Sequence, residues 1–342
     1  MVTKLSTATS RTTDLVLAPA DWLAPICVEM QRVEAILQGF LPAGVPIAAD
    51  AFQHAVDAGG KRLRPAVCLL AAGAVRPGQD ALPEATIEAA AVVEATHLAS
   101  LMHDDVIDEA DMRRGRESTR VRWGNRASVL VGDYIAAQAY RVLIDEVGRW
   151  STAVLCEAIM EMCEGQFAHA TTKGKCTEAE YLDIIRAKTG SLFRAACEMG
   201  ARTVCDEDGP VTAAIACGLQ LGTAFQIVDD LLDLYADPAE TGKPVGSDLR
   251  TGQYTLPVIA ALERDRSGAL RKVIERSGSN DLTNDAISQV AQLADKFGGR
   301  AYAVRRAHEF ASAAEGALSA LPTSPHRDAL AAICTDVLLR IP

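Results

Sequence analysis

Two aspartate clusters with identical spacing are the part of the sequence best suited to chemistry. Residues 104–108 (Asp-Asp-Val-Ile-Asp) and 229–233 (Asp-Asp-Leu-Leu-Asp) each end a long apolar run. On a helix, the first and last aspartate of each cluster lie on one face, with the middle one about 100° away. Burying acids beside a core-forming run is costly unless cations or hydrogen-bond donors compensate. Both clusters therefore predict a site for cations.

Mg²⁺ is the cation that these clusters suit, because every candidate ligand is an oxygen. Mg²⁺ usually takes one or two carboxylates together with water and phosphate oxygens, so two facing clusters would hold several Mg²⁺ ions and a diphosphate. A Ca²⁺ EF-hand is excluded because its loop pattern is absent. Two solvated helix ends remain the alternative. The candidate ligands are Asp104, Asp105, Asp108, Asp229, Asp230 and Asp233.

Basic residues that could bind the phosphates accompany the clusters. The turn 59–65 (GGKRLRP) places Lys61, Arg62 and Arg64 just before a predicted helix N-terminus, where backbone N–H groups and the helix dipole favour anions. His97 precedes Asp104 by about two helical turns, on roughly the same face. The alternatives are a basic surface turn and a histidine that merely packs in the core.

A lysine and a glycine interrupt another apolar run at residues 188–190 (Lys-Thr-Gly), where both are locally unfavourable. This pattern fits a cation and a hydroxyl aimed at a phosphate, or else a lysine that reaches solvent beside a kink. The glycine-containing loop 241–248 could act as a mobile cover.

The elements that must position these residues are helices. Apolar positions recur at helical spacing, and no alternating strands bounded by hairpin turns occur. We predict an all-α fold, a single large helical bundle, over residues 21–342, after a disordered lead at 1–20. The predicted helices span 22–37, 48–58, 65–75, 83–110, 127–147, 151–171, 178–205, 210–234, 256–263, 269–276, 285–297, 299–320 and 327–339, with a loop at 237–255.

The composition narrows the class of protein. The 342 residues are 49% hydrophobic and 23% charged, as in globular proteins, and the net charge of −11 argues against nucleic acid as a partner. The nine cysteines show no CxxC pair and no zinc spacing, which predicts buried free thiols in a reducing compartment. Neither a secretory signal nor an uninterrupted apolar run of about 18 residues occurs, so we expect a cytoplasmic protein without a membrane span.

Six motifs together resemble those of the trans-isoprenyl diphosphate synthases, or polyprenyl synthetases, from about Trp22 onwards. The DDxxD motif alone also occurs in class I terpene cyclases, whereas the combination is specific. The resemblance implies an isoprenoid-synthase type of helical bundle with a central apolar cavity, and a homodimer. The motifs are GGKRLRP (59–65), HDDVIDEADMRRG (103–115), KTG (188–190), FQIVDDLLD (225–233), GKPVGSDL (242–249) and TLP (255–257).

The implied activity is Mg²⁺-dependent prenyl transfer. An allylic diphosphate (dimethylallyl, geranyl, farnesyl or geranylgeranyl) ionises to a carbocation and pyrophosphate. The double bond of isopentenyl diphosphate then attacks the cation, and loss of a proton, with pyrophosphate as the usual acceptor, gives a product five carbons longer. Two alternatives are a class I terpene cyclase, which has no need of GGKRLRP, and a non-catalytic partner subunit, which predicts eroded acid motifs.

The resemblance also assigns roles by position. Both aspartate clusters would bind Mg²⁺, with ionisation assisted by Arg113, Lys188 and Lys243, which would hold the allylic diphosphate. Gln253 stands where many members have a lysine two residues before TLP, which removes one cation expected near that diphosphate. Thr189 and Gln226 would line the allylic site, and the diphosphate of isopentenyl diphosphate would be held by Lys61, Arg64, His97 and Arg114.

The length of the product is expected to depend on the residue five places before the first aspartate. An aromatic residue there closes the tunnel under a short chain in this family, but here the position is Ala99, with Ser100 beside it. We therefore predict a product of about C30 or longer, with geranylgeranyl diphosphate (C20) as the alternative. Tyr140 and Leu143 are the candidates to end the tunnel.

Overall fold

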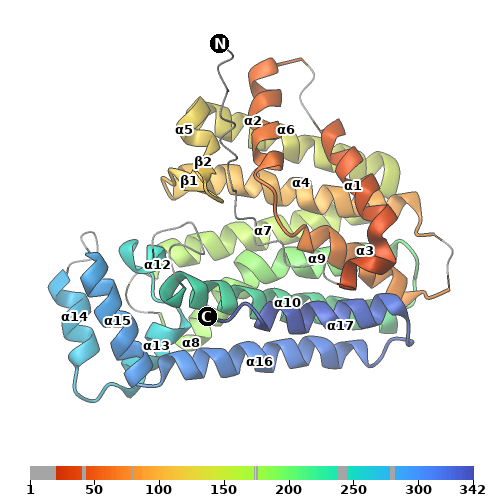
Figure 1. Cartoon of the computed structure of the whole chain (residues 1–342). Coiled ribbons are helices and arrows are strands. Elements are labelled where there is room, and N and C mark those ends of the chain that lie inside the picture. Colours follow the sequence, from red (N-terminus) through yellow and green to blue (C-terminus); the bar gives the residue numbers. More distant parts are fainter. Residues whose placement is uncertain are drawn as a thin grey trace, which may run out of the picture.

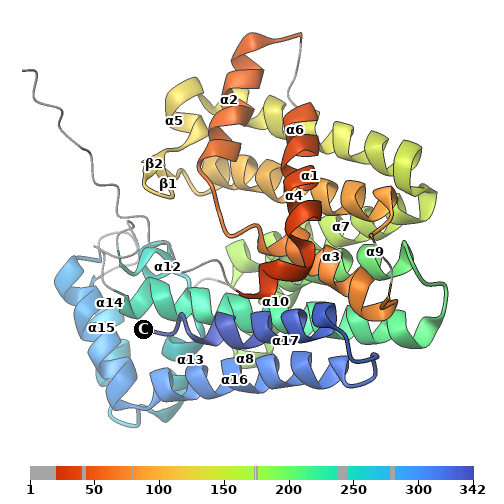
Figure 2. The same ribbon diagram turned by 45° about the vertical axis from the view of Figure 1, so that its right-hand side comes forward.

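The computed structural model describes residues 21–40, 44–78, 81–172, 174, 176–236, 245–277 and 282–342. Within these residues the fold is a bundle of helices, which confirms the predicted all-α class (Figures 1 and 2). Strand is limited to one small antiparallel hairpin, β1 (Met112–Arg113) with β2 (Arg116–Glu117), in which Met112 pairs with Glu117.

The helices of the first half run from η1 to α7. They are η1 (Asp21–Ile26), α1 (Cys27–Gly39), α2 (Pro46–Asp57), α3 (Leu63–Val75), α4 (Glu84–Ile107), α5 (Thr119–Trp123), α6 (Asn125–Val142), η2 (Leu143–Val147) and α7 (Arg149–Thr171).

The second half continues with α8 (Glu178–Ile185), η3 (Arg186–Gly190), α9 (Ser191–Arg202), α10 (Asp208–Tyr235), α12 (Ser247–Arg250), α13 (Leu256–Arg264), α14 (Ala269–Ser277), α15 (Asn284–Lys296), α16 (Gly299–Leu318) and α17 (Pro325–Leu338). Of the three η segments, η1 is a 3₁₀-helix, whereas η2 and η3 are π-helical.

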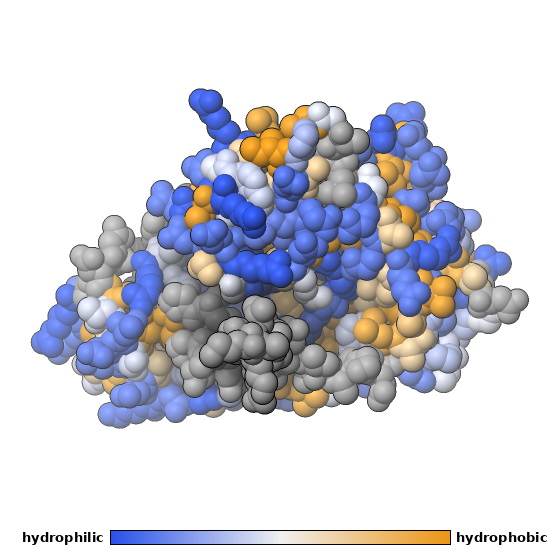
Figure 3. Space-filling model, turned by 45° about the horizontal axis from the view of Figure 1, so that its top comes forward, coloured by the Kyte–Doolittle hydropathy of each residue, from blue (hydrophilic) through white to orange (hydrophobic). Residues whose placement is uncertain are grey.

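The core forms around the most apolar helices. Every residue of α3 from Pro65 to Val75 is buried, and α10 packs between α9 and α16. A second, smaller hydrophobic cluster joins α13, α14 and α15, which lie at one end of the bundle in both ribbon views. The face seen in Figure 3 is mostly hydrophilic, with hydrophobic residues in separate patches.

Among the described residues, α10 is the one helix long and apolar enough to cross a membrane by length and composition. In the structure 61% of its most apolar stretch is buried within the protein, and its neighbours are other helices of the bundle. The apolar character of α10 is therefore explained by its central place in the core.

Several predicted elements need correction. Helix α4 ends at Ile107, short of the predicted 110, because Glu109 takes a left-handed conformation (φ 51°). The predicted helix 178–205 is interrupted by η3, and α12 forms within the predicted loop. The hairpin and α5 were not predicted, although Ser118 caps α5 by accepting a hydrogen bond from Val121 N–H. The predicted disorder of 1–20 lies outside the described residues.

The cysteines are all free, as predicted, but their burial was overestimated. Cys68, Cys197, Cys217 and Cys334 are buried, whereas the other five are half-buried or exposed.

Candidate active site

Each aspartate cluster lies in the C-terminal part of a helix. Asp104 and Asp105 occupy the last turn of α4, with Asp108 as its C-cap, and Asp229 to Asp233 lie in the last two turns of α10. The C-terminus of a helix carries partial negative charge, which disfavours carboxylates there. The sequence therefore stabilises these acids with cations and donors from elsewhere in the chain.

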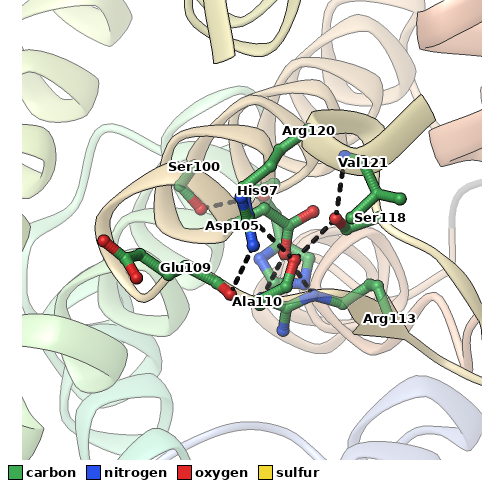
Figure 4. Close-up of polar contacts among 9 residues, drawn as sticks. All are labelled: His97, Ser100, Asp105, Glu109, Ala110, Arg113, Ser118, Arg120 and Val121. Carbon is green, nitrogen blue, oxygen red and sulfur yellow. Dashed lines mark hydrogen bonds and ion pairs between the residues drawn. The ribbon is translucent and has the colours of Figure 1, made fainter. Parts of the chain in front are cut away.

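Arg113 neutralises the most buried acid of the first cluster. Its Nε and Nη2 donate to Asp105 Oδ1 at 2.9 and 2.6 Å, and Asp105 is only 3% exposed (Figure 4). The β1–β2 hairpin returns Arg113 to the end of α4. Burial raises the pKa of Asp104, opposed by the positive charges of Lys188 and Arg113.

The turn between α4 and α5 is fixed by hydrogen bonds to its carbonyl groups. Ser118 Oγ donates to Ala110 O at 2.6 Å, and Arg120 Nη2 donates to Glu109 O at 2.7 Å (Figure 4). These contacts hold the hairpin against α4, so that Arg113 is placed by the backbone as well as by its own ion pair.

The second cluster is held by a chain of hydrogen bonds that begins in η3. Thr189 Oγ1 donates to Gln226 Oε1 at 2.7 Å, and Gln226 Nε2 donates to Asp230 Oδ1 at 2.8 Å. Tyr181 Oη donates to Asp230 Oδ2 at 2.6 Å. Burial raises the pKa of Asp230 to about 7, against the lowering effect of these donors, and the nearby Asp229 carboxylate raises it further.

The other two aspartates of this cluster contact distant parts of the chain. Asp229 Oδ1 accepts from Arg340 Nη2 at 2.8 Å, and the Arg340 guanidinium lies 5.0 Å from the Phe225 ring centre. Asp233 accepts from the N–H groups of Ser247 and Asp248 at 3.2 and 3.3 Å, which ties the first turn of α12 to α10.

Small residues bring η3 close to its neighbours. A Cβ added to Gly165 of α7 would lie 2.8 Å from Lys188 N, and one added to Gly222 of α10 would lie 2.8 Å from Gly190 Cα. Such approaches require glycine, because real Cβ atoms do not sit so near backbone atoms. The predicted Lys-Thr-Gly segment is thus a π-helical turn packed against α7 and α10.

The residues predicted to bind isopentenyl diphosphate form a group that we call the cationic corner: Lys61, Arg64, His97 and Arg114. Gly60 has φ 143° and lies flat against the Arg114 guanidinium, where a Cβ would be 2.6 Å from Nη1. The guanidinium of the half-buried Arg64 lies 4.7 Å from the Phe193 ring centre, and its buried Nε has no hydrogen-bond partner among the described residues. Burial lowers the pKa of Arg64 to about 10. Burial also lowers the pKa of His97 well below its usual value, and the positive charges of Arg64 and Arg114 lower it further.

The same corner lies near a residue of each aspartate cluster, because Arg114 lines a pocket with Asp105 and the charge of Asp229 reaches Lys61, Arg64 and Arg114. Burial and the positive charge of Arg340 lower the pKa of Lys61, whereas the negative charge of Asp229 opposes this shift. The negative charge of Asp229 also opposes the lowering of the pKa of Arg64 and Arg114, so both arginines lie within electrostatic range of the end of α10. An anion in this corner would meet four basic or hydrogen-donating groups.

Two arginines in the site region have roles that the sequence did not reveal. Arg62 does not face the corner as a free cation: its guanidinium binds Glu94 at 2.9 Å and Glu34 at 2.6 Å, and both Arg62 and Glu94 are nearly buried. Arg340, near the C-terminus, was not predicted at all. No sequence motif marks it, because its partner Asp229 is 111 residues away.

A pocket lies between η3, α7 and the segment before α13. It contains the predicted Lys188, Thr189, Gln226 and Asp230, together with Gln253, whose side chain is buried. It also contains His169, which was not predicted. Lys243 lies outside the described residues.

The predicted chain-length residues lie on α4 and on two elements packed against it, α6 and η2. Ala99 is 4% exposed, and Ser100 Oγ donates to His97 O at 2.8 Å, which turns this hydroxyl back onto its own helix. Leu143 is fully buried in η2, which packs on α4, whereas Tyr140 is half-buried.

The donor set fits Mg²⁺ by chemistry, since both clusters offer carboxylate oxygens whose charge is incompletely balanced. Burial is the main cause of the raised pKa values of Asp104 and Asp230, and the negative charges of the neighbouring aspartates raise them further. Within the described part of the chain, however, no three His, Cys, Asp or Glu side chains converge on a single metal position. Mg²⁺ commonly takes only one or two carboxylates when phosphate oxygens and water complete its shell.

Comparison with known proteins places this site in a family. The family described as Polyprenyl synthetase matches residues 45–292. An all-trans-nonaprenyl-diphosphate synthase (geranyl-diphosphate specific) from Rhodobacter capsulatus is 36% identical over 94% of this chain and 98% of its own. An octaprenyl diphosphate synthase from Escherichia coli is 35% identical over 88% and 93%.

A similar structure has also been solved. The crystal structure of a polyprenyl synthase from Caulobacter crescentus, complexed with calcium and isoprenyl diphosphate, superposes with a TM-score of 0.89. It is 30% identical and covers 95% of this chain and 98% of its own. The helical bundle and the two aspartate motifs agree with these matches, and the chain belongs to the polyprenyl synthetase family.

Proposed function

We propose that this protein is a trans-polyprenyl diphosphate synthase that condenses isopentenyl diphosphate with an allylic diphosphate and releases pyrophosphate. One observation carries the proposal: Lys61, Arg64 and Arg114 lie within electrostatic range of Asp229 in the second aspartate cluster, and Arg114 lines a pocket together with Asp105 of the first. A terpene cyclase, which binds one diphosphate, has no use for this additional set of cations.

In this mechanism two diphosphates bind side by side. Lys61, Arg64 and Arg114 hold isopentenyl diphosphate, and His97, whose pKa is lowered by burial, serves as a neutral hydrogen-bond partner. Lys188 and Arg113 face the allylic diphosphate and stabilise the negative charge that develops as its C–O bond breaks. Apolar residues of α4 and α9 exclude water that would quench the carbocation.

Magnesium would be held by Asp104, Asp105 and Asp108 on one side and by Asp229, Asp230 and Asp233 on the other. Bound there, several Mg²⁺ ions would supply Lewis-acid stabilisation of the leaving diphosphate. The Caulobacter relative was crystallised with calcium, which supports a divalent-metal site of this kind. Asp105, which already pairs with Arg113, would be shared between that arginine and a bound ion.

The product is proposed to be C30 or longer. Position 99 carries the small side chain of alanine where an aromatic residue would be expected to shorten the product, and the relatives reported above are named for octaprenyl and nonaprenyl products. Purified enzyme should convert farnesyl diphosphate and isopentenyl diphosphate, with Mg²⁺, to products whose dephosphorylated alcohols migrate at C30 or above. A single C20 alcohol would contradict the length. Consumption of the allylic diphosphate without isopentenyl diphosphate would indicate a cyclase.

A homodimer located in the cytoplasm is also proposed. Large apolar side chains are exposed on α6 and α7, with Leu130 at 67% and Phe167 at 75%, and burying such residues against a second copy would be favourable. Light scattering should give twice the mass of one chain for the wild type, and Leu130→Glu should reduce it. A monomeric wild type would refute the dimer.

A further inference from the structure

A histidine of α7 occupies the pocket next to η3. His169 follows Gly165 by four residues, so the two lie on one face of the helix. That face meets η3 so closely that a Cβ on Gly165 would be 2.8 Å from Lys188 N. His169 therefore looks toward the Lys-Thr-Gly segment, and it lines the same pocket as Lys188 and Gln253.

The described lining residues of the pocket offer little positive charge for a diphosphate. Lys188 is the only lysine or arginine among its described lining residues, and Asp230 and Asp248 contribute negative charge. Gln253, 8% exposed, offers only an amide where the family resemblance leads one to expect a lysine. A donor from another element would compensate for this loss.

The chemistry of His169 suits that purpose. Burial, assisted by the charge of Lys188, lowers the pKa of His169 to about 4, so the ring is neutral and presents one N–H donor. The other titratable residues that line the pocket are Cys176, Tyr181, Lys188, Asp230, Asp248 and Tyr254. Of the polar side chains on the C-terminal turn of α7, His169 and Thr172 are the ones that line this pocket.

We propose that His169 is a substrate-binding residue of the allylic site, whose ring N–H donates to the allylic diphosphate in place of the ammonium group that Gln253 does not provide. This inference rests on the proposed function, because it requires an allylic diphosphate in the pocket. A hydrogen bond to a charged phosphate oxygen is worth about 1.5–3 kcal/mol, or roughly ten- to a hundredfold in affinity.

The test compares His169→Ala, Gln253→Lys and the double variant, with steady-state kinetics for each substrate. We expect His169→Ala to raise KM for farnesyl diphosphate about tenfold or more and to leave KM for isopentenyl diphosphate within about twofold. Gln253→Lys should lower KM for farnesyl diphosphate, and in its presence His169→Ala should cost several-fold less. His169→Asn, which keeps an N–H donor, should recover part of the loss.

Controls separate this inference from the broader proposal. His308→Ala changes an exposed histidine of α16 and should leave both KM values unchanged. If wild-type enzyme elongates farnesyl diphosphate but His169→Ala raises both KM values equally, or if Gln253→Lys does not reduce the effect, the role of His169 is refuted while the synthase activity stands. If wild-type enzyme does not elongate the substrate, the proposed function fails first.

Discussion

The buried ion pair between Arg62 and Glu94 is expected to hold the phosphate-binding turn in place. Arg62 has a left-handed backbone (φ 48°) between Lys61 and Arg64, and its guanidinium is anchored to Glu94 on α4 at 2.9 Å. The side chains are only 10% and 3% exposed. Replacing Glu94 with leucine keeps the volume similar but leaves the Arg62 charge buried with only Glu34 to balance it.

The expected cost follows from this geometry. Removing one partner of a buried ion pair costs about 3–5 kcal/mol, and the remaining contact with Glu34 places Glu94→Leu near the lower limit. With a urea m-value of about 3 kcal/mol/M, a loss of about 3 kcal/mol lowers the unfolding midpoint by about 1 M. Because Arg62 adjoins two predicted phosphate ligands, KM for isopentenyl diphosphate should rise as well.

The assay is urea unfolding followed by circular dichroism, with a matched control. Arg32 and Glu84 also form an ion pair that involves α4, but their side chains are 45% and 56% exposed. Glu84→Leu should therefore cost about 1 kcal/mol or less. Replacing both buried partners, as in Arg62→Met with Glu94→Leu, should recover part of the stability. Equal midpoints for Glu94→Leu and Glu84→Leu would refute the reasoning.

Three further perturbations follow from the site. Burial raises the pKa of Asp230 to about 7, above about 3.9 in an unfolded chain, so this group makes the metal-free protein less stable as pH rises from about 4 to 7. Asp230→Asn should thus raise the urea midpoint in EDTA at pH 8 more than at pH 5, while it lowers kcat. An equal or smaller gain at pH 8 would contradict this. Arg340→Ala should lower kcat/KM about tenfold in Mg²⁺-dependent assays, yet change stability by about 1 kcal/mol or less, because the pair is partly exposed. Full activity would exclude Arg340 from the site. Gly165→Ala should cost about 1–3 kcal/mol and raise KM for the allylic substrate, because the new methyl group meets the backbone of η3 at 2.8 Å. Gly316→Ala, with nothing within 4 Å of its Cβ, is the matched control and should be neutral or stabilising.

Helical periodicity was enough to predict the fold class and most helices, because an apolar face must be buried wherever it occurs along the chain. It also placed the two aspartate clusters at the ends of apolar runs, which became the C-terminal parts of α4 and α10. The local pattern contains this information, since each cluster and its helix are contiguous.

The choice of partner for each charged side chain was not predictable in the same way. Among the cations of residues 61–64, the packing of α1 and α4 decides that Arg62 is paired with acids, and the packing of α9 decides that Arg64 lies over Phe193. His169 has no motif around it, and its position depends on how closely α7 meets η3. Such contacts are set by tertiary packing rather than by neighbouring residues.

The π-helical turn η3 has a consequence for how one stretch of chain serves two sets of neighbours. A π turn holds about one residue more than an α turn, so it shifts the phase of the helix that follows by about 100°. Before the shift, Tyr181 of α8 reaches Asp230; after it, Phe193 of α9 lies beneath Arg64. Deleting one residue between 186 and 190 would restore a regular helix, and every site residue outside this turn would still be present. The side chains of α9 would then be rotated by about 100° relative to those of α8, so Tyr181 and Phe193 could not both keep their contacts with Asp230 and Arg64.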